Sequence, residues 1–303
     1  MADLHVNLAG LQLSNPVLAA SGCFGFGREY NEFYPIRQAG GIMVKGLTLE
    51  PCAGNPTPRI AETPAGMLNS IGLQNPGVDA FLSNELPWLL SQEAAVIANI
   101  NGHALEDFEE IARRLQGAPG LKAIEVNISC PNVSHGGMFF GTDPAMASEV
   151  TRRVRKHTSL PLIIKLSPNV TDITEIARAV VSEGADILSL INTLLGMAID
   201  VKTRKPLLAR KVGGLSGPAV KPVALRMVWQ TAQAVDVPII GMGGISSAQD
   251  ALEFLMAGAS AVAVGCASFV DPLAIPRIIG DLNAWLDREG FAGVRDVVGL
   301  ALR

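Results

Sequence analysis

Residues 127–135, with the sequence NISCPNVSH, bring hydrogen-bonding and acid–base chemistry together in a short stretch. They supply two amides, two hydroxyls, an imidazole and the thiol of Cys130, directly after the apolar run AIEV at 123–126. Amide side chains donate and accept hydrogen bonds at once, and a thiolate can act as a base or a nucleophile. A buried strand that ends in such a group indicates a binding or catalytic site rather than ordinary packing.

Polar side chains also stand at the ends of other apolar runs. In chain order, these positions are Ser21, Lys45, Asn99, Asn127, Lys165 and Asn192. Taken singly, an asparagine there is an ordinary turn former, and a lysine reaches past apolar neighbours to water. Six successive strands that end in polar groups favour a shared site, because a barrel points these ends into one basin. The same architecture predicts apolar strand interiors.

Eight short apolar runs are spaced along the chain for a strand–helix repeat. They occupy residues 15–21, 41–46, 94–100, 123–129, 161–167, 186–192, 237–244 and 260–265. Helical patterns lie between them at 104–116, 143–158, 171–184 and 246–258. Near-continuous apolar runs are typical of parallel strands covered on both faces. We therefore predict an α/β fold, a (β/α)8 TIM barrel that forms a single domain over residues 1–303.

A doubly wound sheet is the competing architecture. It would need a G-x-G-x-x-G turn after its first strand, and SGCFGFG at 21–27 does not contain that pattern. Three further segments surround the predicted barrel. Residues 4–14 alternate around a turn and predict an N-terminal hairpin at the base of the barrel. The long connections 47–93 and 193–217, the second with a candidate hairpin, predict insertions at the C-terminal rim.

Glycines follow the last two predicted strands, at Gly243, Gly244 and Gly265. The loops after strands seven and eight of such a barrel commonly hold a phosphate, which backbone N–H groups at a helix start favour. Because no dinucleotide pattern accompanies these glycines, a mononucleotide such as FMN is the simplest ligand. A barrel lysine would stabilise an anionic reduced flavin. The alternative use of Lys165 is as the Schiff-base residue of a lyase.

Composition excludes several other classes of protein. The 303-residue chain has a formal charge of −4, so it lacks the basic surface that nucleic-acid binding requires. The basic run RRVRKH at 152–157 is interpreted as a solvated helix face. No apolar run reaches the ~20 residues of a membrane span, and no signal peptide is evident. These features predict a cytoplasmic protein that binds neither membrane nor nucleic acid.

Four cysteines, at positions 23, 52, 130 and 266, are too far apart to form a CxxC pair. We therefore predict no metal site and no iron–sulfur cluster made by this chain alone. Widely spaced thiols in a cytoplasmic protein are normally reduced. Cys23 and Cys52 are interpreted as small buried hydrophobes, whereas the polar surroundings of Cys130 favour a chemical role.

Several motifs together resemble the dihydroorotate dehydrogenase family. They are GNPTPR, MLNSIGLQNPG, NISCPN, INT, GGLSGPA and GMGGI, and the likeness covers essentially the whole chain. The segment SGCFGFGREY and the cysteine at 130 are similar to the NAD-linked class 1B catalytic subunits. One departure is Leu47 in KGLTLEP, where a small or hydroxylated residue is expected, and it puts a local loop contact in doubt.

The resemblance implies an FMN-binding barrel that oxidises (S)-dihydroorotate to orotate in the biosynthesis of UMP. Cys130 is then the base that removes the C5 proton, while flavin N5 accepts the C6 hydride. The implied substrate contacts are Lys45, Asn69, Ser70, Ile71, Gly72, Leu73, Asn127, Asn192 and Thr193. The implied FMN contacts are Ser21, Lys45, Gly46, Asn99, Asn127, Lys165, Ile191, Gly217, Gly243, Gly244, Gly265 and Cys266.

The resemblance also implies how the electrons leave the enzyme. They would pass to NAD through a partner subunit that carries FAD and a [2Fe–2S] cluster. The expected assembly is a homodimer of this chain with one partner on each copy, a heterotetramer of two catalytic and two partner chains. The alternatives are a fumarate-linked class 1A enzyme, a flavin barrel acting on another pyrimidine such as dihydrouracil, and the Schiff-base lyase.

Overall fold

The computed structural model describes residues 2–129 and 140–303 and contains a closed barrel of eight parallel strands. In barrel order these are β3 (Val17–Ala19), β4 (Gly41–Met43), β7 (Val96–Ile100), β8 (Leu121–Asn127), β9 (Leu162–Lys165), β10 (Ile187–Leu190), β15 (Ile239–Met242) and β16 (Ala261–Val264). Strand β16 pairs with β3 and closes the ring. The predicted (β/α)8 barrel is therefore confirmed; seven of the eight predicted apolar runs contain their barrel strand whole, and β8 begins two residues before its run.

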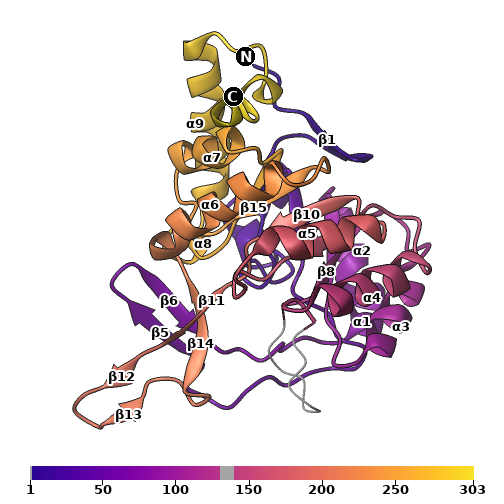
Figure 1. The fold of residues 1–303 in the computed structure, drawn as a ribbon, viewed down its shortest axis with the longest axis vertical. Coiled ribbons are helices and arrows are strands. Elements are labelled where there is room, and N and C mark those ends of the chain that lie inside the picture. Colours follow the sequence, from indigo (N-terminus) through magenta and orange to yellow (C-terminus); the bar gives the residue numbers. More distant parts are fainter. Residues whose placement is uncertain (1, 130–139) are drawn as a thin grey trace.

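The barrel strands are buried, except for Lys122 and Asn127 of β8, because helices cover their outer faces (Figure 1). The main covering helices are α3 (Leu105–Leu115), α4 (Pro144–Arg155), α5 (Ile173–Ser182), α6 (Lys221–Ala232), α7 (Ala248–Met256) and α9 (Ala274–Glu289). Each helix turns an apolar stripe inward; in α3 this stripe is Phe108, Ile111, Ala112 and Leu115. Burial on both sides explains why Val, Ile, Leu and Ala fill the strands without polar alternation.

Local sequence signals set where the predicted helices begin and end. Asp143 caps α4 by accepting a hydrogen bond from the Ala145 backbone N–H at 2.8 Å, and Asp172 caps α5 in the same way. Gly258, after α7, has a φ of +107°, a conformation that residues with a Cβ rarely adopt. The four predicted helices are confirmed, each shortened by one to three residues at its ends.

Two further elements close the barrel's base and extend its rim. Strands β1 (Val6–Leu8) and β2 (Leu11–Leu13) form the predicted antiparallel hairpin, with Leu13 against the start of β4 at the amino-terminal end of the barrel. At the opposite end lies a four-stranded sheet, the rim sheet, in the order β11 (Leu194–Met197), β14 (Val212–Ser216), β6 (Gly66–Asn69) and β5 (Ile60–Thr63) (Figure 1). The short pair β12 (Ile199–Asp200) and β13 (Lys205–Pro206) extends the same insertion.

The rim sheet goes beyond the single hairpin predicted within residues 193–217. Strands β5 and β6 come from the earlier insertion and pair with β14 across a long sequence separation. Strand β5 has no buried face, so it lacks the apolar pattern that marks the barrel strands. The remaining short elements are α1 (Val78–Ala80), a π-helical turn (Phe81–Glu85), α2 (Leu86–Ser91), α8 (Ala267–Val270) and 3-10 turns at Tyr30–Glu32, Ile36–Gln38, Pro218–Val220, Val294–Val297 and Leu300–Leu302.

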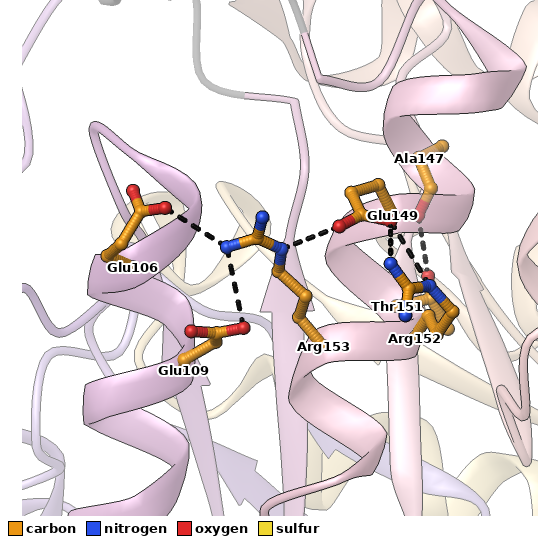
Figure 2. A network of polar contacts seen from close by, with 7 residues as sticks. All are labelled: Glu106, Glu109, Ala147, Glu149, Thr151, Arg152 and Arg153. Carbon is orange, nitrogen blue, oxygen red and sulfur yellow. Dashed lines mark hydrogen bonds and ion pairs between the residues drawn. The ribbon is translucent and has the colours of Figure 1, made fainter.

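The basic run at 152–157 lies on the outside of the barrel, where it pairs with acids. Figure 2 shows Arg153 of α4 between α3 and its own helix. Its guanidinium lies 3.0 Å from Glu106 and 3.5 Å from Glu109 on α3, and 2.6 Å from Glu149 on α4. Such exposed pairs contribute up to about 1 kcal/mol each, and they account for this run without a ligand. Among the described residues, no helix is both long and apolar enough to cross a bilayer.

Asp250 ties α7 to α6 beside the loop that follows β15. One carboxylate oxygen accepts hydrogen bonds from the backbone N–H and hydroxyl groups of Ser246 and Ser247, at 2.9–3.0 Å. The other accepts from the Lys221 ammonium at 2.7 Å. Burial alone would raise the pKa of Asp250, but these hydrogen bonds outweigh it and hold the pKa below its usual range.

We predict that Asp250→Asn lowers the free energy of unfolding at pH 7 by about 1–2 kcal/mol, because an amide cannot accept all of these bonds. The folded-state pKa of Asp250 is lowered, so its stabilisation is complete above the unfolded pKa of about 4 and is lost as the pH falls below it. Urea unfolding at pH 7 and pH 3 should show the difference shrinking with acid. Asp236→Asn, at an exposed aspartate, is the control; an equal loss in both variants would contradict the prediction.

Candidate functional site

A cavity of about 770 Å³ lies between the carboxyl ends of the barrel strands and the rim sheet. It is large enough for a nucleotide cofactor and a small substrate together. Its lining includes these predicted residues: Ser21, Lys45, Gly46, Asn69, Ser70, Ile71, Gly72, Leu73, Asn99, Asn127, Lys165, Asn192 and Thr193. The structure thus brings together the six polar strand-end side chains that the sequence singled out, along with the predicted rim segment.

Lys165 places a buried cation at the floor of the cavity. Its ammonium donates a hydrogen bond to Ser21 Oγ at 3.0 Å, which joins opposite sides of the barrel. In the strand register Lys165 stands beside Asn127 on β8 and Ser189 on β10. A buried ammonium is costly without compensating partners. An anionic or carbonyl-rich ligand in the cavity would therefore be favoured at this point.

Four asparagines and a glutamate form a continuous hydrogen-bonded row along the cavity wall, here called the amide chain. Asn192 Nδ2 donates to Asn127 Oδ1 at 3.1 Å, and Asn127 Nδ2 donates to Asn101 Oδ1 at 2.8 Å. Asn101 Nδ2 donates to Asn99 Oδ1 at 3.0 Å, and Asn99 Nδ2 donates to Glu125 Oε2 at 2.5 Å. Each amide in the row is therefore bonded to its neighbours and held in one orientation.

The sequence predictions missed Asn101, Glu125 and Ser189. The Ser189 hydroxyl donates to Glu125 Oε1 at 2.6 Å, and all three residues are fully buried. The expectation of apolar strand interiors is therefore wrong at Glu125 and Ser189, where two barrel strands carry polar groups that satisfy each other. The two-residue period of side chains along a strand could have revealed two of them. Asn101 is two residues after Asn99, and Glu125 is two residues before Asn127, so each pair lies on one strand face.

The same two-residue spacing continues beyond β9, where Ser167 and Asn169 follow Lys165 and also line the cavity. Asn169 Oδ1 accepts from the Leu195 backbone N–H at 2.9 Å, and its Nδ2 donates to the Thr193 carbonyl at 3.1 Å. Asn169 therefore fixes the first strand of the rim sheet to the barrel. This role follows from tertiary contacts that the local sequence does not reveal.

The predicted substrate segment 69–73 forms the rim-sheet wall of the cavity. Asn55 holds it in place: its backbone N–H donates to the Ile71 carbonyl at 2.9 Å, and its Nδ2 donates to the Ser70 carbonyl at 3.0 Å. Gly72 has a φ of +75°, and a Cβ there would lie 2.5 Å from Asn55 Cγ, so only glycine fits. Asn55 was not predicted, because nothing in GNPTPR indicates which loop it will contact.

The other predicted cofactor residues lie outside the cavity lining, in the turns behind it. These are Ile191, Gly217, Gly243, Gly244, Gly265 and Cys266. Gly243 and Gly244 have φ values of +126° and +78°, and a Cβ on Gly244 would lie 2.8 Å from the Gly217 carbonyl. The glycines of the seventh strand turn and of the α6 entry therefore approach each other so closely that side chains are excluded. Gly265 and Cys266 form the turn after β16, beside Cys23.

Three of the four thiols can be described. Burial raises the pKa of Cys23 to about 11, and the neighbouring Cys266 adds to this effect, although Lys165 and Lys45 oppose it. Burial also raises the pKa of Cys266, and the Cys52 thiol donates to the Gly72 carbonyl at 3.4 Å. Cys23 and Cys266 are thus neutral thiols at pH 7, unsuited to act as bases. Cys130 lies outside the described residues.

The fold and this cavity define a (β/α)8-barrel enzyme with its site at the C-terminal rim. A family model described as dihydroorotate dehydrogenase matches residues 3–286. Three similar proteins are each named dihydroorotate dehydrogenase B (NAD(+)), catalytic subunit. The protein from Bacillus cytotoxicus is 56% identical over 99% of this chain and 97% of its own, that from Anoxybacillus flavithermus 56% over 99% and 96%, and that from Geobacillus kaustophilus 57% over 99% and 96%.

The chain belongs to the dihydroorotate dehydrogenase family. The resemblance drawn from the sequence motifs, including the likeness to the NAD-linked class, is therefore confirmed.

The close contact between Gly46 and the amide chain gives a test of the site's packing. A Cβ at Gly46 would lie 2.1 Å from Asn101 Nδ2 and 2.8 Å from Asn99 Oδ1. We predict that Gly46→Ala lowers the free energy of unfolding by about 1–3 kcal/mol, because both buried amides must shift. Gly280→Ala, in open space on α9, should be neutral or stabilising by up to about 1 kcal/mol. Chemical unfolding of both variants measures this, and a Gly46→Ala protein as stable as wild type would refute it.

Proposed function

We propose that this chain is the catalytic subunit of an NAD-linked dihydroorotate dehydrogenase that uses FMN to oxidise (S)-dihydroorotate to orotate in UMP biosynthesis. Membership of the family makes the chain an oxidoreductase of pyrimidine biosynthesis. The observation that supports the finer assignment best is the convergence of amides and lysines in one cavity at the barrel's C-terminal rim. We propose further that residues 1–303 act as one domain, in the cytoplasm.

The residues present fit a flavin mononucleotide. Lys45 and Lys165 line the same cavity, and cations there suit the carbonyl-bearing edge of a flavin ring, which becomes negative on reduction. Gly243 and Gly244, in the turn after β15, leave no room for side chains, and Gly265 lies in the turn after β16, so these turns suit the close approach of a phosphate. Ser21, Gly46, Asn99 and Asn127 would hold the ring system, and Ile191, Gly217, Gly243, Gly244, Gly265 and Cys266 the remainder. When bound, FMN supplies a hydride acceptor.

Dihydroorotate is a six-membered ring with carbonyl oxygens, ring N–H groups and a carboxylate. Asn127, Asn192 and Lys45 face the cavity from the barrel, and the segment 69–73 faces it from the rim. Amides and an ammonium match the carbonyl and carboxylate oxygens of such a ring. We therefore propose that Lys45, Asn127, Asn192 and Thr193 contact the dihydroorotate ring. Residues 69–73 are proposed to contact the same substrate from the rim. These contacts would hold C6 toward the flavin and C5 toward the opposite side.

Oxidation requires a base for the C5 proton, and Cys130 is the proposed base. Its neighbour Ser129 lines the cavity, and so do Gly141 and Thr142 beyond the far end of the undescribed segment. A thiolate that takes the C5 proton leaves an electron pair that forms the C5–C6 double bond as the C6 hydride departs. The high pKa of Cys23 and the raised pKa of Cys266 exclude those two thiols from the task at neutral pH.

The electrons must then leave the catalytic chain. The relatives are named catalytic subunits of an enzyme that uses NAD(+), and such a name implies a second subunit. Within residues 2–129 and 140–303, no cluster of three or more His, Cys, Asp or Glu side chains could hold a metal ion. We therefore propose that a partner subunit carries FAD and a [2Fe–2S] cluster, in a heterotetramer built on a homodimer of this chain. The names of the relatives do not favour the fumarate-linked alternative, and family membership does not favour the lyase.

We predict that the purified chain is yellow and that dihydroorotate bleaches its flavin absorbance under nitrogen. The chain alone should form almost no NADH, because the proposed partner carries the centres that reach NAD. The visible spectrum and the NADH absorbance measure these two steps separately. A colourless chain that borohydride traps with substrate would support the lyase. Rapid reoxidation by fumarate would support the fumarate-linked enzyme, and full NAD reduction without a partner would refute the proposed electron path.

We predict that Cys130→Ala leaves FMN bound with a normal spectrum but slows flavin reduction by dihydroorotate about a hundredfold or more. Cys130→Ser should keep partial activity that rises toward high pH, because a hydroxyl is a much weaker acid than a thiol. Anaerobic stopped-flow reduction across a pH series measures both variants, with the wild-type chain as the reference. Fast reduction by Cys130→Ala would overturn the assignment of the base.

A further inference from the structure

Glu125 is a charged residue in the middle of a barrel strand, fully buried beneath the cavity. It faces Asn99 across the β7–β8 register and accepts that residue's Nδ2–H at 2.5 Å. Its other oxygen accepts from Ser189 Oγ at 2.6 Å. Burying a carboxylate costs free energy, so we expect such a residue where its hydrogen bonds have a specific structural role. The proposed chemistry does not use Glu125, so its role must lie in what it does to its neighbours.

The amide chain has a direction because Glu125 stands at one end of it. A carboxylate only accepts hydrogen bonds, whereas an amide can be turned to donate or accept at either of its two atoms. Asn99 must therefore present Nδ2 to Glu125, which leaves its Oδ1 for Asn101. The same constraint passes on, so Asn101 turns its Oδ1 to Asn127. One acceptor fixes the orientation of three successive amides.

At the other end of the amide chain, backbone N–H groups impose the same orientation on the amides. The Ser129 N–H donates to Asn127 Oδ1 at 3.1 Å, and the Thr193 N–H donates to Asn192 Oδ1 at 2.8 Å. A backbone N–H can only donate. The row therefore runs from obligatory donors near the cavity mouth to an obligatory acceptor in the barrel interior. Reversing any one amide would place like groups against each other.

We propose that Glu125 is a positioning residue that sets the direction of the amide chain, so that Asn127 offers only an N–H to the cavity. Asn127 Oδ1 already accepts two hydrogen bonds, from Asn192 and Ser129. Among the described residues, Asn127 Nδ2 donates one hydrogen, to Asn101, and its second hydrogen has no partner. Within the same part of the chain, Asn192 Nδ2 likewise donates only to Asn127. These two residues therefore recognise an acceptor atom of a ligand, such as a carbonyl oxygen, and reject a ring N–H at the same place.

The inference about which ligand atoms Asn127 and Asn192 recognise rests on the proposed function. The direction of the hydrogen bonds in the amide chain does not. Asn127→Asp tests that direction through stability. The new carboxylate would face Asn101 Oδ1, so Asn101 and then Asn99 would have to turn over, which would put Asn99 Oδ1 against the Glu125 carboxylate. Glu125→Gln removes this conflict, because a glutamine amide can donate to a reversed Asn99 and accept from Ser189. In the native direction the same glutamine can accept from Asn99 and donate to Ser189.

The experiment is a double-mutant cycle on the purified, flavin-loaded chain, read by urea unfolding. We expect Asn127→Asp to raise the unfolding equilibrium constant about tenfold or more in the wild-type background. In the Glu125→Gln background, the same substitution should raise it less than about threefold. Additive effects of the two substitutions would overturn the proposal. Flavin content and circular dichroism confirm that each variant is folded.

Two controls separate direction from other causes. The coupling between Asn127→Asp and Glu125→Gln could also arise from simple repulsion between the carboxylate introduced at position 127 and that of Glu125. Such repulsion would persist when Asn101→Ala interrupts the amide chain. The proposal requires the coupling to vanish in that background. If Asn101→Ala does not fold, Asn101→Leu, which is apolar and closer in size to asparagine, serves instead. Orotate binding, measured by perturbation of the flavin spectrum, gives a second reading. Asn127→Asp should weaken it about tenfold or more, while Glu125→Gln alone should change it less than about threefold. If Asn127→Asp and Glu125→Gln show no coupling in urea unfolding, the proposed role of Glu125 is wrong. If the wild-type protein does not bind orotate, only the proposed substrate is wrong.

Discussion

Several polar groups at the mouth of this barrel are buried, among them Asn99, Asn101 and Lys165, and that constraint shapes the site. A buried amide or ammonium must find hydrogen-bond partners inside the protein or lose free energy. Here the partners are each other: the amide chain ends on Glu125, and the Lys165 ammonium reaches Ser21 across the barrel. The side chains that contact a ligand are therefore held in place before it arrives, and orientation requires no rearrangement during the reaction.

The closed barrel makes this mutual satisfaction possible. Neighbouring strands place Asn99 beside Glu125 in register, where their side chains form a hydrogen bond, and Asn127 beside Lys165. Helices outside and an apolar core keep water from competing for the same groups. The rim sheet then supplies the second wall of the cavity, where Asn55 and Asn169 fix loops that could not hold their shape alone. The hydrogen-bonded barrel side chains on one side and the rim sheet on the other form a cavity with fixed walls, which suits the binding of a planar ring.

Much of the fold could be predicted from the sequence, because the barrel strands are continuous apolar runs and the helices have recognisable caps such as Asp143 and Asp172. The strand-end side chains were also predictable, since the fold itself sends them to one place. Strand β5 was missed because neither of its faces is buried. Glu125 was missed because a lone charge in an apolar run shows its role only through its partner on another strand. The assignment of Cys130 comes from the family resemblance, because residues 130–139 lie outside the described residues.

A crystal structure of the chain with FMN and orotate would test the central claim most directly, because it shows which atom of the ring faces each amide. We expect a carbonyl or carboxylate oxygen of orotate within hydrogen-bond distance of the amide groups of Asn127 and Asn192, inside the cavity between the barrel mouth and residues 69–73. An orotate ring N–H directed at Asn127, or a ring bound elsewhere on the molecule, would contradict it.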